Sequence, residues 1–505
     1  MYTDVITEIA RFKAGRIHVA RAGLATQARL CVDMLQQGRG MAWVVKNRDE
    51  LLTARALMRL FSPELSSGDF LPDAFDKGGW TSLPPFSPRS ANREGWTERL
   101  SALYALRSGQ AKGLILTADN LLPKLVPLDF FENREVTLIR GEDVSLDMIL
   151  EQAVGWGYER VSMVSNPGEI ARRGDILDIM PPGYDKPIRL DFFGDLIEEI
   201  RLFDPVSQRS KANLSEVRVL PVSPIRQSPA DQAKMQARWK SLFQKNMLTE
   251  NERFGLTRLQ EQGDFRLLPG CCYDTATNLE AWLPADTVWV LPGLSDFRDM
   301  LSSAERLWTE AFEAQDVEGR PQPQRLAMRE ASDVESACER FACVHAEPLV
   351  MGIAKGIHAL PERSLSSFED LFPSTAEQDR PWQTLVQALK RWQNDKRQTI
   401  LCFASEKSRT KFLNLASQDG LSPLLRYSGE QHGLFALVAP FRAGAELIWD
   451  QSLILGEDLL QPHAEKSRRV PTGAFKGLDR YDELKPGDLL VHRDYGIARF
   501  GGLLR

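Results

Sequence analysis

Residues 168–210 read GEIARRGDILDIMPPGYDKPIRLDFFGDLIEEIRLFDPVSQRS, a pattern that predicts three successive β-strands. Within it, residues 188–193 alternate between apolar and other side chains, and strand side chains point to opposite faces in turn. One face therefore carries Ile, Leu and Phe and should pack on a core. The other face carries Arg189, Asp191 and Phe193. An arginine beside an exposed aromatic ring is typical of a protein-binding hot spot.

Two turns separate the three predicted strands. Residues 181–183 read Pro-Pro-Gly, and residues 194–195 read Gly-Asp, both typical of tight turns. With these turns the first two strands pair antiparallel, which places Arg173 across from Phe193 or from the glycine that follows it. Arg189 lies on the same face as Phe193, about 13 Å along the strand at ~3.3 Å per residue. The expected patch is therefore an exposed ring with a guanidinium on either side.

The periodicity along the chain predicts an α/β protein of several domains. Residues 1–135 alternate short apolar strands with helices, which favours a parallel sheet. Residues 136–220 form a small α+β unit around the opening stretch. Helices and a buried strand resume in residues 221–349, so the β-rich unit is expected to be inserted into one larger domain. Residues 350–464 predict a further α/β domain.

The C-terminal part of the chain changes in composition. Residues 465–483 are polar and are interrupted by Pro471 and Gly473, which predicts an interdomain linker. Residues 484–505 alternate apolar and polar side chains between glycines. They are expected to begin a small β-barrel that the chain does not complete.

The composition excludes several classes of protein. The 505 residues carry a net charge of −6, and a chain that grips DNA over a wide face is usually basic. DNA binding without catalysis is therefore a weaker alternative. No apolar run is long enough to span a membrane. The six cysteines form no CxxC pair, which favours reduced thiols and a cytoplasmic location over a zinc site.

The chain carries no motif for catalysis. Nucleotide hydrolysis through a phosphate-binding loop requires GxxxxGK[ST], and the sequence contains no Gly-Lys dipeptide. No histidine lies in HExxH, and no serine lies in GxSxG. We therefore predict no catalytic residue, no cofactor-binding residue and no metal ligand in this chain.

Residues 168–210 resemble the second domain of the bacterial transcription-repair coupling factors and of their relative, the excision-repair protein UvrB. Residues 98–117 and 279–291 resemble the first domain of both families. Residues 487–503, GDLLVHRDYGIARFGGL, resemble the first strands of the RNA-polymerase-interacting domain of the coupling factors. UvrB lacks that domain, so the C-terminal residues favour the coupling factors.

The resemblance implies a fold and a function. The first domain should be a helicase-like parallel α/β domain without a nucleotide site, because residues 17–30 lack the lysine and the second glycine of the phosphate loop. Coupling factors act in transcription-coupled nucleotide excision repair, where they recognise RNA polymerase stalled at DNA damage and recruit UvrA. Their ATP- and magnesium-dependent motor, which contacts DNA, follows the polymerase-interacting domain, and this chain should end before it.

The resemblance also assigns a binding site. It implies that Arg173, Arg189 and Phe193 bind UvrA, whereas Arg172 should point to the opposite face and interact with solvent or an internal carboxylate. The leading hypothesis is a non-catalytic, monomeric, UvrA-recruiting module. The alternative is a UvrB-like ATP-dependent helicase that binds damaged DNA.

Overall fold

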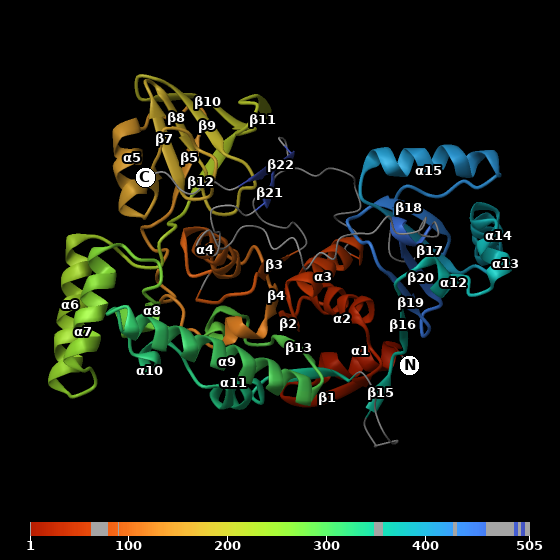
Figure 1. Ribbon diagram of the computed structural model, residues 1–505, viewed down its shortest axis with the longest axis horizontal. Helices are drawn as coiled ribbons and strands as arrows, with labels where there is room; N and C mark the ends of the chain where they lie inside the picture. The colour runs from red at the N-terminus through yellow and green to blue at the C-terminus, as the bar shows by residue number, and fades with distance from the viewer. Residues whose placement is uncertain are drawn as a thin grey trace.

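The computed structural model describes residues 2–61, 79–88, 90–347, 357–427, 432–460, 489–492 and 496–499. These residues form a mixed α/β protein with several sheets (Figure 1). The larger sheets have seven, six and five strands. No helix of the described residues is both long and apolar enough to cross a membrane.

The seven-stranded sheet contains strands from both ends of the region 1–359. Its order is β15-β1-β14-β13-β2-β4-β3, and each pair of neighbours is parallel. The strands are β1 (Gly15–Ala20), β2 (Met41–Val45), β3 (Trp80–Leu83), β4 (Gly113–Thr117), β13 (Val288–Pro292), β14 (Ala342–Glu347) and β15 (Ile357–Ala359). Because β13 lies directly beside β2, the segment between β4 and β13 interrupts one continuous sheet.

Both faces of this sheet are covered. In β2, Ala42 and Val44 face one core cluster, while Met41, Trp43 and Val45 face another. The first cluster includes side chains of α4 (Arg93–Arg107), α6 (Pro229–Gln244), α7 (Glu250–Glu261) and α9 (Leu294–Val317). The second includes side chains of α1 (Tyr2–Arg11), α2 (Leu24–Gln36) and α3 (Arg48–Phe61). A parallel sheet buried in this way needs strands that are apolar throughout, as β2 is.

The interrupting segment forms the six-stranded sheet, with order β11-β10-β9-β8-β7-β6. Its strands are β6 (Glu159–Arg160), β7 (Glu169–Arg173), β8 (Ile176–Ile179), β9 (Ile188–Phe193), β10 (Leu196–Phe203) and β11 (Ser210–Leu214). All neighbours are antiparallel except β6 and β7. The helix α5 (Leu146–Gly155) and the pair β5 (Val136–Ile139) and β12 (Glu216–Val219) contribute to the same core.

The prediction of one strand before the Pro-Pro-Gly turn is wrong. Residues 169–179 form a hairpin, β7 and β8, in which Arg173 pairs with Ile176. Gly174 has a φ of +62°, a conformation that glycine adopts without steric cost, and it allows the chain to reverse after Arg173. The sheet therefore gains a strand between Arg173 and β9.

The five-stranded sheet has the order β16-β19-β20-β17-β18. Its strands are β16 (Glu362–Leu365), β17 (Gln398–Phe403), β18 (Leu434–Val438), β19 (Gly444–Leu447) and β20 (Ser452–Gly456). One face packs under α14 (Pro381–Asn394) and α15 (Glu406–Gln418). On the other face, Ile400 and Phe435 belong to the same core cluster as side chains of α1 and α2. This part of the described chain thus combines a mixed sheet with helices on one face.

At the C-terminus, β21 (Leu489–His492) and β22 (Gly496–Arg499) pair antiparallel. The predicted linker 465–483 lies outside the described residues, as does most of the segment 484–505. The β-barrel expected there stays a prediction.

Candidate protein-binding site

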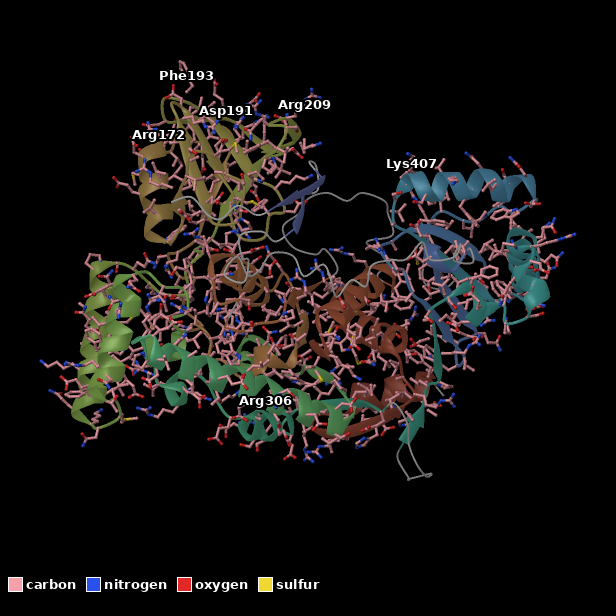
Figure 2. All side chains as sticks on the ribbon, in the orientation of Figure 1. Arg172, Asp191, Phe193, Arg209, Arg306 and Lys407 are labelled. Atoms are coloured by element: carbon pink, nitrogen blue, oxygen red, sulfur yellow. The ribbon has the colours of Figure 1, made fainter. Side chains whose placement is uncertain are left out.

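The two faces of β9 differ as the alternation predicts. Ile188, Leu190 and Phe192 are buried in the core of the inserted unit. Phe193 has 74% of its surface exposed, at the end of β9 just before a turn in which Gly194 has a φ of +63°. In Figure 2 this ring lies at the tip of the six-stranded sheet, far from the seven-stranded sheet. A large apolar side chain is therefore displayed on the hairpin that β9 and β10 form.

Arg189 shares this outer face but is held by neighbouring side chains. Its Nε and Nη2 donate to the two carboxylate oxygens of Asp178, at 2.7 and 2.8 Å, and Nη2 also donates to Gln208 at 3.1 Å. The guanidinium lies 4.5 Å from the centre of the Phe203 ring. The hydrogen bonds that Arg189 donates to the Asp178 carboxylate raise the pKa of Arg189. Arg189 is thus a fixed positive charge, with most of its donors already used.

The other charges of the outer face neutralise one another. Arg201 on β10 donates to Asp191 on β9, and its Nε lies 3.4 Å from the Glu199 carboxylate. Asp191, expected between the two binding arginines, is therefore paired within the sheet. These cross-strand pairs stiffen the face on which Phe193 stands.

The sequence predicts that Arg173 lies across from Phe193, and this prediction is wrong. β8 separates β7 from β9, so Arg173 faces Ile176, which in turn faces Asp191. The antiparallel register predicted across the Pro-Pro-Gly turn is correct for β8 and β9. Arg173, however, lies on β7, on the other side of β8. Its side chain is exposed, and Nη2 donates to the Ser162 carbonyl at 2.7 Å. Arg173 and Phe193 therefore share a face without facing each other.

Arg172 behaves as predicted. It points to the opposite side of the sheet and forms an ion pair with Asp147 in the first turn of α5. The two adjacent arginines thus have separate surroundings, which makes Arg172 a natural control for Arg173.

Two further residues near Phe193's sheet stand out only in the structure. Asp178 is 2% exposed and fixes Arg189, and an acid within the apolar strand Ile-Leu-Asp-Ile is a signal for an ion pair. Val206 is 92% exposed in the turn after β10, where Asp204 accepts hydrogen bonds from the backbone. A lone valine in a Pro-Val-Ser turn carries no such signal.

The described residues contain no group of three or more histidine, cysteine, aspartate or glutamate side chains arranged to hold a metal ion. All six cysteines are buried and unpaired with one another. Burial raises the pKa of the Cys402 thiol to about 12. These thiols are therefore core side chains in the protonated form.

Residues 136–224 match the family model described as the UvrB interaction domain. The match covers the six-stranded sheet, α5 and the pair β5 and β12, so the inserted unit is similar to this domain over its whole length.

Over most of its length the chain is similar to transcription-repair-coupling factors. It is 28% identical to that of Myxococcus xanthus over 465 residues, covering 83% of this chain and 37% of the relative. It is 26% identical to that of Escherichia coli over 456 residues, covering 84% and 37%. A Staphylococcus aureus relative is 42% identical over 128 residues, covering 25% and 11%. The expected resemblance to the N-terminal part of a coupling factor is confirmed, and the chain spans about 37% of the length of the first two relatives.

Proposed function

We propose that this chain is the UvrA-recruiting region of a transcription-repair coupling factor, and that it acts in nucleotide excision repair when RNA polymerase stalls at damaged DNA. The inserted unit would bind UvrA through the outer face of its six-stranded sheet. The observation that carries the proposal is Phe193, 74% exposed on the β9–β10 hairpin within the segment that matches the UvrB interaction domain.

The surroundings of Phe193 support a protein partner. Large aromatic side chains and arginines dominate the binding energy of protein interfaces. Arg173 can offer further N–H donors to a carboxylate, while Arg189 is pre-oriented by Asp178 and loses little side-chain entropy on binding. We therefore propose that Phe193 and Arg173 contact UvrA directly. Arg189 would contribute a positive charge that Asp178 holds in place next to UvrA.

The remaining partners follow from the same proposal. RNA polymerase would bind the unit that β21 and β22 begin, and DNA would be contacted only through a motor outside this chain. We further propose that the chain is monomeric and cytoplasmic, holds no cofactor and does not hydrolyse ATP.

Calorimetric titration with purified UvrA tests the proposal. The triple variant Arg173→Ala, Arg189→Ala, Phe193→Ala should lose about 2–4 kcal/mol of binding free energy, or roughly 30- to 1000-fold in affinity. Phe193→Ala alone should account for the largest share. Arg172→Ala is the matched control and should bind as the parent does, because its side chain lies on the other face. Parent-like binding by the triple variant would disprove the site.

The enzyme alternative has its own test. The UvrB-like helicase hypothesis requires ATP to bind near residues 17–30, so titration with Mg-ATP would give stoichiometric heat. We expect none, because the chain offers no Gly-Lys for the phosphates.

A further inference from the structure

The chain passes from one sheet to another at Glu362. Just before it, β15 pairs parallel with β1 of the seven-stranded sheet. Glu362 itself begins β16, which pairs antiparallel with β19 of the five-stranded sheet. At the crossing, the Glu362 backbone N–H donates to the Arg21 carbonyl at 3.0 Å. Figure 1 shows β15 and β16 running past the N-terminal helices between the two units. Glu362 is thus the residue at which the two sheets join.

The Glu362 carboxylate lies at the N-terminus of α2. Its Oε2 accepts the Thr26 N–H at 2.7 Å, and its Oε1 accepts the Ala25 N–H at 3.2 Å. The first N–H groups of a helix have no partner within the helix, so these bonds satisfy two of them. Gly23, before the helix, leaves no room for a Cβ because the carboxylate occupies that space. The carboxylate therefore caps a helix that is distant in sequence.

This position follows the first strand of a parallel sheet, where many α/β proteins bind a nucleotide phosphate at the N-terminus of the next helix. β1 ends at Ala20 and α2 begins at Leu24, so the strand-loop-helix arrangement is present. The bound anion, however, is a side chain of the protein itself. The loop therefore lacks the lysine that would bind a phosphate, and its anion position is already filled by the Glu362 carboxylate.

A second contact from the five-stranded sheet reaches the same helix turn. Trp449, between β19 and β20, donates its Nε1 to Thr26 Oγ1 at 3.0 Å. Its ring stacks on Tyr2 with 4.2 Å between the ring centres, and the Tyr2 hydroxyl donates to Asp33 on α2 at 2.6 Å. The first turn of α2 is thus held by β16, through Glu362, and by the turn between β19 and β20, through Trp449.

We propose that Glu362 is a latch: its carboxylate is an internal anion ligand that closes the N-terminus of α2 and fastens this loop to the five-stranded sheet. The latch makes the order of the loop depend on the neighbouring unit. Without the carboxylate, the same N–H groups would donate to a small external anion.

Chemical rescue tests the latch in the full chain. Glu362→Ala removes the atoms of one acetate ion, so acetate can occupy the space left. Burial raises the pKa of Glu362, so hydrogen exchange followed by mass spectrometry is run at about pH 8, which favours the ionised carboxyl in the parent. Exchange in residues 21–30 should be about 5- to 30-fold faster in the variant, as expected for loss of a helix cap. Sodium acetate, compared with sodium chloride at equal ionic strength, should restore most of the protection.

Three comparisons make the result decisive. Glu406→Ala removes an exposed carboxylate from the first turn of α15 and should show neither faster exchange in residues 21–30 nor a response to acetate. Glu362→Gln keeps the volume, so it should show a smaller increase that acetate does not reverse, and it replaces the alanine variant if that fails to fold. UvrA binding should be unchanged in both Glu362 variants. Unchanged exchange in Glu362→Ala, or an acetate effect equal to that on the parent, would overturn the proposal.

Discussion

The six-stranded and seven-stranded sheets use their faces in opposite ways. In the inserted antiparallel sheet, one face packs on a core and the other carries Phe193 and a set of paired charges. In the parallel sheet, core clusters cover both faces, and the N-terminus of α2 at its edge is occupied by Glu362. An antiparallel sheet can leave one face in solvent, whereas the crossovers of a parallel sheet cover both.

The comparison shows where a partner can bind. The parallel sheet can present the loops at its strand ends to a partner. At the N-terminus of α2, however, the bound anion is the Glu362 carboxylate of the chain itself. The antiparallel sheet offers a whole face, and the ion pairs on that face reduce the cost of ordering it. We therefore expect recognition on the inserted unit and internal support on the parallel unit.

The largest effect should separate the two faces of β9. Leu190 is fully buried, and Leu190→Ala should lower the free energy of unfolding of the inserted unit by about 2–5 kcal/mol. Phe193→Ala should change it by no more than about 0.5 kcal/mol, because the ring is solvated. Urea unfolding followed by circular dichroism measures both. Similar losses would mean that Phe193 is a core residue and not a displayed one.

A second prediction concerns the charges on the outer face. Asp178→Asn removes the carboxylate that Arg189 binds. The free energy of unfolding should fall by about 1–3 kcal/mol in the same urea experiment. The substitution should also weaken UvrA binding, because Arg189 loses its orientation. Asp195→Asn, at the exposed hairpin turn, is the matched control and should be neutral. A neutral Asp178→Asn would show that Arg189 needs no internal partner.

On the parallel unit, Gly23→Ala should cost about 1 kcal/mol, because the added methyl displaces the Glu362 carboxylate from the helix N-terminus. The φ of Gly23 is −75°, which alanine adopts freely, so backbone strain contributes nothing. In a double-mutant cycle, Gly23→Ala should cost much less when Glu362 is already alanine. Additive losses would contradict the close contact.

The smallest effect is a pH dependence in the inserted unit. Burial alone would raise the pKa of Glu169, but hydrogen bonds from Asn166 and Ser165 lower it. Its stabilising contribution is therefore complete above the unfolded pKa of about 4.3 and is lost as the pH falls from there through the lower folded value. Glu169→Gln should reduce the drop in melting temperature between neutral and acid pH. An unchanged drop would assign the acid sensitivity to other groups.

Much of the local structure was predictable from short-range patterns. The alternation in residues 188–193 predicted the buried and exposed faces of β9, and apolar runs such as β2, β4 and β17 predicted strands covered on both faces. The return of α/β signals after residue 220 predicted the insertion, and the topology places β13 beside β2. Arg172 pointing away from Arg173 followed from the period of two.

The errors arose where one local choice changed the pairing. The alternation over residues 168–180 predicts one strand and places Arg173 opposite Phe193, whereas Gly174 turns the chain and divides this stretch into β7 and β8. The predicted face of Arg173 is correct, because residues paired across neighbouring strands point to the same face of a sheet. Its predicted neighbour is wrong, because β8 lies between Arg173 and β9. Asp178 was missed because its partner is 11 residues away in the sequence and on another strand.

The sequence by itself determined which side chains could be displayed, because side-chain direction in a strand depends only on local alternation. It also determined that residues 17–30 lack a lysine for phosphate, since that is a matter of residue type. Only the tertiary structure decided that Arg189 is held by Asp178, that β8 separates Arg173 from Phe193, and that Glu362 fills the N-terminus of α2. Those contacts join residues from separate strands and, for Glu362, residues more than 300 positions apart, and no local pattern encodes such a meeting.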